Sequence, residues 1–73
     1  MFDIIIANIN RNILLADMKA YLKQLKPGGL ILFSGFYESD FNVIDEEAKS
    51  LNLRLINRKE KNNWTALTYE LSQ

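Results

Sequence analysis

Residues 25–35 read LKPGGLILFSG, a Pro-Gly-Gly turn that leads directly into an uninterrupted apolar run. Before this turn, over 13–25, apolar side chains recur at spacings of three and four, which predicts an amphipathic helix. Pro27 and the two glycines are expected to end that helix. Leu30–Ser34 is too short for a helix and predicts a buried strand that Gly35 closes.

A second apolar run lies on the N-terminal side of the helix. Residues 2–8 read FDIIIAN, which predicts a strand buried on both faces because its apolar residues do not alternate with polar ones. Asn10 or Asn12 is placed to cap the start of the helix, and Lys23 and Lys26 to face the dipole at its end. Two buried strands joined through a helix should run parallel, with a right-handed crossover.

A second amphipathic helix is predicted over 41–51. Its apolar residues again recur at spacings of three and four, at Phe41, Ile44, Ala48 and Leu51. Either Ser39 or Asp40 is in position to cap it. We place Asp45 on the solvent-facing side of this helix, where it would form an i,i+4 ion pair with Lys49.

Two further strands, 53–60 and 64–71, complete the chain. Asn62 and Asn63 lie between them, and Asn tolerates the positive φ that tight hairpins require. The predicted order is therefore β-α-β-α-β-β. Residues 1–73 form one α/β domain, whose mixed sheet joins two parallel strands to a C-terminal antiparallel hairpin.

The composition excludes several kinds of chemistry. The chain has 73 residues, no His, no Cys and a formal net charge of zero. It therefore lacks an imidazole base, a thiolate nucleophile, a disulfide and an ordinary zinc site, and we predict no metal. A neutral chain argues against general binding to nucleic acid or to an anionic membrane. We find no membrane-spanning run and no signal peptide, so we expect a cytoplasmic protein.

Candidate site residues lie where the parallel strands end, because open α/β sheets bind ligands at the carboxyl ends of their strands. Asn8 ends the first strand, and Ser34 with Gly35 ends the second. Taken by itself, an Asn at a strand end is more often a turn or cap residue than a ligand contact, and Gly35 more often allows a turn than the approach of a ligand. Trp64 and Tyr69 are expected to pack on the sheet rather than to stack on bases.

Four segments together carry a family resemblance. DIIIANI at 3–9, LKPGG at 25–29, SG at 34–35 and WTAL at 64–67 resemble the C-terminal half of the catalytic domain of class I S-adenosylmethionine-dependent methyltransferases. The combination is most similar to the PrmA family, which methylates protein eleven of the large ribosomal subunit. The resemblance implies a partial Rossmann-like methyltransferase fold. In it, this chain would supply the fourth to seventh strands, the last lying antiparallel between the fifth and the sixth.

The resemblance also assigns roles to individual residues. It implies S-adenosylmethionine as the cofactor, with Asn8 at its methionine end and facing the substrate amine. Ala7 and Ile9 would flank that cofactor site, and Ser34 and Gly35 would line the substrate side. The sequence has no counterpart of the glycine-rich loop and the acidic residue that hold the cofactor in this family. We therefore expect the chain alone to bind the cofactor weakly or not at all, and to be inactive as a protein-lysine methyltransferase.

Two alternatives remain open at the level of sequence. The segment from Asp3 to Asn8 is a central strand in the family's domain, so here it would be an exposed apolar edge that invites pairing with another copy. The chain would then be a non-enzymatic, self-associating α/β module and a homo-oligomer. Alternatively, the parent methyltransferase acts on a small molecule or a nucleic acid, and the neutral charge makes nucleic acid the less favoured of these.

Overall fold

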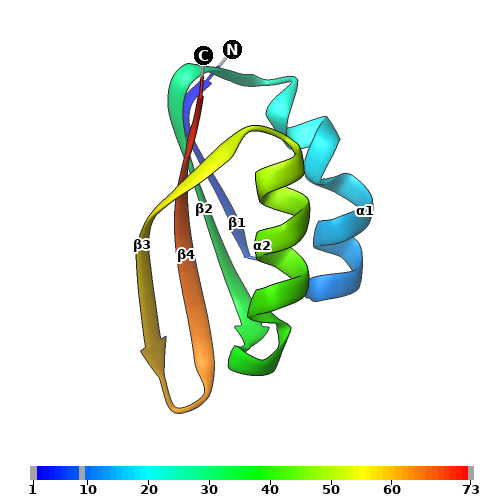
Figure 1. The fold of residues 1–73 in the computed structure, drawn as a ribbon, viewed down its shortest axis with the longest axis vertical. Helices are drawn as coiled ribbons and strands as arrows, with labels where there is room; N and C mark the ends of the chain where they lie inside the picture. Colours follow the sequence, from blue (N-terminus) through cyan, green and yellow to red (C-terminus); the bar gives the residue numbers. More distant parts are fainter. Residues whose placement is uncertain (1, 9, 73) are drawn as a thin grey trace.

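A single mixed sheet carries both helices on one of its faces (Figure 1). The computed structural model describes residues 2–8 and 10–72 of the chain. In chain order the elements are β1 (Phe2–Asn8), α1 (Arg11–Leu22), β2 (Leu25–Tyr37), the short 3₁₀ helix η1 (Glu38–Asp40), α2 (Phe41–Ser50), β3 (Leu53–Lys61) and β4 (Trp64–Leu71). The predicted α/β class and the predicted order of helices and strands are confirmed.

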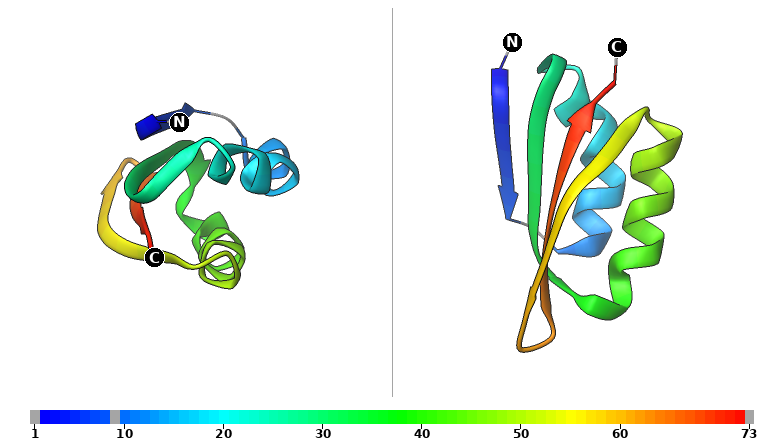
Figure 2. Two further views of the ribbon diagram at one scale, coloured as in Figure 1. Left: turned by 90° about the horizontal axis from the view of Figure 1, so that it is seen from above. Right: turned by 60° about the vertical axis from the view of Figure 1, so that its left-hand side comes forward.

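The strand order across the sheet is β1-β2-β4-β3 (Figure 2). β1 runs parallel to β2, whereas β4 runs antiparallel to both β2 and β3. The last strand of the chain therefore lies between two earlier ones, as the family resemblance implied. The hairpin turn between β3 and β4 also follows the prediction, with φ values of 51° at Asn62 and 70° at Asn63.

Helix α1 begins at a side-chain cap. The Oδ1 atom of Asn10 accepts a hydrogen bond from the backbone N–H of Ile13 at 3.0 Å, so Asn10, and not Asn12, caps the helix. Leu14 and Met18 are fully buried on the predicted apolar face. Ile13 was placed on the same face but is 47% exposed, whereas the next residue, Leu14, faces the core.

The end of α1 differs from the prediction. The helix ends at Leu22, and Leu25 already belongs to β2. Lys26 also belongs to β2 and not to the end of the helix. Its ammonium lies 3.4 Å from the carboxylate of Asp3 on β1. The physical reason is Pro27, since the residue before a proline is disfavoured in helical conformation. The LKPGG motif is therefore the kinked start of a strand and not the last turn of a helix.

Gly29 sits where this kinked start crosses β1. A Cβ atom at this position would lie 2.7 Å from a methyl carbon of Leu25 and 2.8 and 2.9 Å from the carbonyl oxygens of Lys26 and Asp3. Two of these three atoms belong to the backbone and cannot move aside easily. Only glycine allows the two strands to approach so closely here.

Asp45 of α2 is buried, contrary to its predicted place on the solvent-facing side. Its side chain accepts a hydrogen bond from the hydroxyl of Tyr69 at 2.7 Å. Its other carboxylate oxygen lies 2.9 Å from the Lys49 ammonium, so the predicted i,i+4 pair does form. The pKa of Tyr69 is raised well above its usual value, by burial first and then by the hydrogen bond to Asp45.

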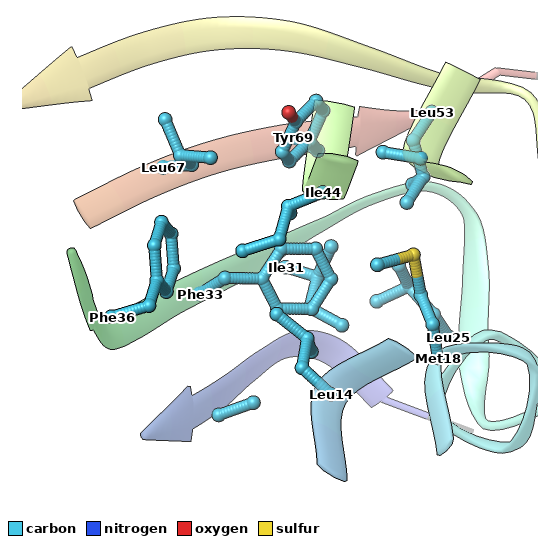
Figure 3. Close-up of a cluster of buried hydrophobic side chains, with 12 residues drawn as sticks. Leu14, Met18, Leu25, Ile31, Phe33, Phe36, Ile44, Leu53, Leu67 and Tyr69 are labelled. Atoms are coloured by element: carbon cyan, nitrogen blue, oxygen red, sulfur yellow. The ribbon is translucent and has the colours of Figure 1, made fainter. Parts of the chain in front are cut away.

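The hydrophobic core fills the space between the sheet and the two helices (Figure 3). The rings of Phe33 on β2 and Tyr69 on β4 meet at a centroid distance of 5.8 Å. The buried apolar side chains come from every helix and strand except η1: Ala7, Leu14, Met18, Leu25, Ile31, Phe33, Phe36, Ile44, Ala48, Leu53, Leu67 and Tyr69.

The opposite face of the sheet carries no helix in the described part of the chain (Figure 2). On β1 this face presents Ile4, which is 59% exposed, and Ile6, which is 70% exposed. The prediction that this strand is buried on both faces is therefore wrong for this chain. Only Ile5 and Ala7, which alternate with these residues, pack against the core.

Candidate functional site at the carboxyl ends of β1 and β2

The two parallel strands bring their carboxyl ends together. In the β1–β2 register Asn8 lies beside Ser34, and Ala7 lies beside Phe33. The backbone of Asn8 is the last position of β1, whereas its side chain and all of Ile9 lie outside the described residues. The backbone thus places Ala7 and Asn8 beside Phe33 and Ser34, at the carboxyl ends of the two strands.

A β-bulge at Gly35 shapes this edge. The register between β2 and β4 shifts between Ser34 and Phe36, and Gly35 has a φ of 91°, in the left-handed region that favours glycine. The extra residue changes which side chains share a face. Phe36 turns into the core, and Tyr37 is paired with Trp64.

Tyr37 and Trp64 form a stacked aromatic pair. Their ring centroids are 4.7 Å apart, the ring planes are inclined by 19°, and both side chains are about half exposed. Trp64 was predicted to pack on the sheet, but it packs on Tyr37 at the end of the sheet with one half open to solvent. Tyr69, predicted in the same way, is fully buried.

Two hollows flank the Tyr37–Trp64 pair. The larger one, of about 660 Å³, is lined by Ser34, Gly35, Lys59, Glu60, Lys61, Trp64, Thr65 and Ala66. The smaller one, of about 360 Å³, is lined by Asn10, Arg11, Asn12, Gly35, Phe36, Tyr37, Asp40 and Trp64. Gly35 and Trp64 are common to both hollows. The predicted substrate-side residues Ser34 and Gly35 therefore line an open hollow rather than the core.

Ala7 faces the other way. Its side chain is only 4% exposed and belongs to the hydrophobic core. Any contact between Ala7 and a ligand at the strand ends would have to come from its backbone. Thr65, which also lines the larger hollow, is 2% exposed, and its hydroxyl has no hydrogen-bond partner among the described residues.

An ion pair holds the rim of the smaller hollow. A guanidinium nitrogen of Arg11, at the start of α1, lies 3.0 Å from a carboxylate oxygen of Asp40. The other oxygen of Asp40 accepts a hydrogen bond from the backbone N–H of Tyr37 at 3.3 Å. Asp40 was one of the two residues predicted to cap α2, the other being Ser39. It stands at the N-cap position, but its side chain makes no capping bond to that helix. It fixes the backbone beneath the aromatic pair instead.

A cation–π contact braces the hairpin against α2. The guanidinium carbon of Arg58 lies 3.8 Å from the centre of the Phe41 ring, and a guanidinium nitrogen lies 2.6 Å from the carboxylate of Glu60. No sequence signal indicated the pairing, because Phe41 and Arg58 lie far apart in the chain.

The described residues hold neither a cluster of metal ligands nor a helix that could span a membrane. Across residues 2–8 and 10–72, Asp and Glu side chains do not gather in groups of three or more that could hold a metal ion. Over the same residues, neither helix has the length and apolar character needed to cross a membrane.

Comparison with known proteins identifies the family. The family model described as ribosomal protein L11 methyltransferase (PrmA) matches residues 1–72. The chain belongs to the PrmA family. A ribosomal protein L11 methyltransferase of Porphyromonas gingivalis is 54% identical over 69 residues, and one of Phocaeicola vulgatus is 52% identical over 68 residues. These matches cover 94% and 93% of this chain but 24% of each relative, so the chain spans about a quarter of their length.

A solved PrmA-type structure has the same fold. The chain superposes on the ribosomal protein L11 methylase of Lactobacillus delbrueckii subsp. bulgaricus with a TM-score of 0.91 and 24% sequence identity. The superposition covers 99% of this chain and 37% of the other. At this identity the likeness establishes the fold alone. The strands of this chain therefore lie in the same arrangement as those of the matched part of that methylase.

Proposed function

We propose that the chain supplies the substrate-facing part of a site that transfers a methyl group from S-adenosylmethionine to a lysine amine of a ribosomal protein. The observation that carries the proposal is the family match over residues 1–72, combined with the strand ends that bring Asn8 beside Ser34. The cytoplasm, where ribosomes work, is the proposed location.

The chain's own residues suit a neutral amine acceptor. A lysine amine has a reference pKa of about 10.4 and must lose its proton before it attacks a methyl group. Lys59, Glu60 and Lys61 line the larger hollow, and the Glu60 carboxylate is already paired with Arg58 at 2.6 Å. The two lysines would therefore disfavour a third ammonium beside them. The amide oxygen of Asn8 would accept a hydrogen bond from the amine and so direct its lone pair.

The cofactor would occupy the space next to these residues. When bound, it supplies an electrophilic methyl group on a sulfonium centre. Asn8, Ile9 and the backbone of Ala7 are the positions that would touch it. The small side chain of Ala66 and the indole of Trp64 give the larger hollow an apolar wall, on which the carbon chain of a lysine could pack.

We further propose that the isolated chain is inactive. The family's glycine-rich loop has no counterpart in the sequence. Calorimetric titration of the chain with S-adenosylmethionine is expected to show no heat of specific binding. Saturable binding with micromolar affinity would contradict this part of the proposal.

A chimera tests the function itself. The matching segment of the Porphyromonas gingivalis relative is replaced by this chain, and methyl transfer to its ribosomal protein is measured. We expect activity, and we expect Asn8→Ala to lower kcat at least about tenfold, as for loss of one transition-state contact. Asn57→Ala on the exposed part of β3 is the matched control. A folded chimera that methylates a small amine or RNA, and not the protein, would overturn the substrate class.

A second candidate function is a self-associating module without enzymatic activity. The specific observation in its favour is the exposed apolar surface of β1, where Ile4 and Ile6 face solvent. This candidate needs no cofactor, and its partner is a second copy of the chain.

A further inference from the structure

The connections that follow β1 and β2 are tied together at one carboxylate. Asp40 ends the short helix η1, which follows β2, and Arg11 begins α1, which follows β1. Their side chains meet at 3.0 Å, although the two residues are 29 positions apart in the chain. In Figure 1, α1 and α2 both begin at the lower end of the molecule, where β1 and β2 end. The ion pair therefore spans the two strand ends at which the candidate site lies.

Asp40 uses both of its carboxylate oxygens. While one oxygen pairs with Arg11, the other accepts a hydrogen bond from the backbone N–H of Tyr37 at 3.3 Å. The Asp40 side chain is only 15% exposed, compared with 43% for that of Arg11. A carboxylate that is held from two sides and mostly shielded from water is a more rigid link than an exposed surface pair. A residue that only capped η1 would need the bond to Tyr37 and not the ion pair.

The link continues from Tyr37 to the β3–β4 hairpin. The ring of Tyr37 stacks on that of Trp64, the first residue of β4. The next residue, Glu38, donates its backbone N–H to the carbonyl oxygen of Asn63 at 2.9 Å. The start of α1, the connection between β2 and α2, and the hairpin turn thus form one braced unit around the smaller hollow.

We propose that Asp40 is a positioning residue for methyl transfer. Through Arg11 it holds the segment that follows Asn8, and through Tyr37 it holds the rim that the two hollows share. The inference rests on the proposed function, because it concerns the placement of the acceptor amine between these two parts of the site. A displacement of about 1 Å at the reacting atoms can lower a rate about a hundredfold, so loss of this link acts on the rate.

Substitutions at Asp40 separate its two contacts. Asp40→Asn keeps an oxygen that accepts from Tyr37 but removes the charge that pairs with Arg11, whereas Asp40→Ala removes both. In the chimera with the Porphyromonas gingivalis relative, we expect Asp40→Ala to lower kcat at least about tenfold and Asp40→Asn to lower it less. Arg11→Gln should match Asp40→Asn, and the double variant should be no slower than either, because all three lack the same contact.

Conservative and remote substitutions distinguish positioning from a merely structural role. Arg11→Lys should retain most of the rate, because the ion pair uses a single guanidinium nitrogen that an ammonium can replace. Arg54→Gln is the matched control, since Arg54 pairs with Glu70 at the other end of the β3–β4 hairpin. We expect Arg54→Gln to leave kcat unchanged. In the Asp40 variants kcat should fall while KM for S-adenosylmethionine changes less than about twofold, at a temperature where every variant is folded.

Amide hydrogen exchange in the isolated chain tests the link without any reaction. The Tyr37 amide should exchange about tenfold faster in Asp40→Ala than in the parent chain, as for loss of one hydrogen bond to a charged group. Asp40→Asn should give an intermediate rate. The amide of Ile31, in the buried middle of the same strand, is the internal control and should not change.

The two experiments fail separately. An unchanged exchange rate of the Tyr37 amide in Asp40→Ala would overturn the link itself. Faster exchange with a kcat no lower than that of Arg54→Gln would overturn the positioning role and leave the proposed methyl transfer standing. A folded chimera that is inactive with the parent chain would overturn the proposed function and, with it, the role of Asp40 in that function.

Discussion

Replacing Tyr69 with Phe removes one hydroxyl from the centre of the molecule and leaves the packing of the ring unchanged. That hydroxyl donates to Asp45 at 2.7 Å, and Asp45 is only 8% exposed. Without it, a buried carboxylate oxygen loses its partner and cannot recover one from water. The variant is therefore expected to unfold more easily, although no apolar contact is lost.

The size of the effect follows from what Asp45 keeps. A hydrogen bond to a charged group contributes about 1.5–3 kcal/mol. The Lys49 ammonium still lies 2.9 Å from the carboxylate of Asp45. We therefore expect the free energy of unfolding to fall by about 2 kcal/mol, in the lower part of this range. In a domain of this size each kcal/mol lowers Tm by about 4–8 °C, so the expected shift is about 8–16 °C.

Urea unfolding followed by circular dichroism measures this loss. Tyr21→Phe is the matched control, because Tyr21 is only partly buried at the edge of the core. The double variant with Asp45→Asn completes a cycle that isolates the coupling between the two side chains. If Tyr69→Phe lowers the free energy of unfolding no more than Tyr21→Phe does, the reasoning is refuted. It is also refuted if the changes in unfolding free energy of Tyr69→Phe and Asp45→Asn simply add in the double variant.

The same contact predicts an alkaline limit to stability. The pKa of Tyr69 is raised in the folded state, whereas in the unfolded chain it has the ordinary value of 10.0. The contribution of the protonated Tyr69 hydroxyl to the stability of the fold is therefore complete below about pH 10 and is lost as the pH rises above that value. The free energy of unfolding should fall more steeply above pH 10 in the parent chain than in Tyr69→Phe. If the free energy of unfolding falls equally steeply with pH in both proteins, Tyr69 is not the group responsible.

Three further substitutions probe the backbone, each by thermal or urea unfolding. Asn10→Ala is expected to cost about 1 kcal/mol because it removes the cap of α1, whereas Asn12→Ala should cost clearly less. Gly29→Ala is expected to cost about 1–3 kcal/mol, since its Cβ would press on two carbonyl oxygens; a neutral result would show that the strands separate freely there. Asn63→Gly is expected to stabilise by a few tenths of a kcal/mol, because its φ is 70°, and a loss of stability would count against strain at this turn.

Local patterns predicted the local structure well. The spacing of Ile44 and Ala48 located α2, and the pair Asn62 and Asn63 located the hairpin, because helix periodicity and turn conformation depend on neighbouring residues. The order of the strands followed from the family resemblance, not from periodicity.

What the sequence missed depends on residues far apart in the chain. Asp45 resembles part of a solvated acidic run until β4 brings Tyr69 to it. The bulge at Gly35 moves Tyr37 onto the same face as Trp64, and alternation alone predicts no such shift. The exposure of β1 depends on which layers cover it, and an apolar run does not report whether such a layer is present.

The strand order also constrains the sequence of events in folding. β4 follows β2 and β3 in the chain, yet it separates them in the sheet. Until it emerges from the ribosome, the two earlier strands have no neighbour through which to join, and β3 is tied to the rest of the sheet only through α2. The hairpin of β3 and β4 closes locally and within microseconds, whereas its docking on β2 must span the whole of α2. Pairing of β4 with β2 is therefore expected to follow closure of the β3–β4 hairpin.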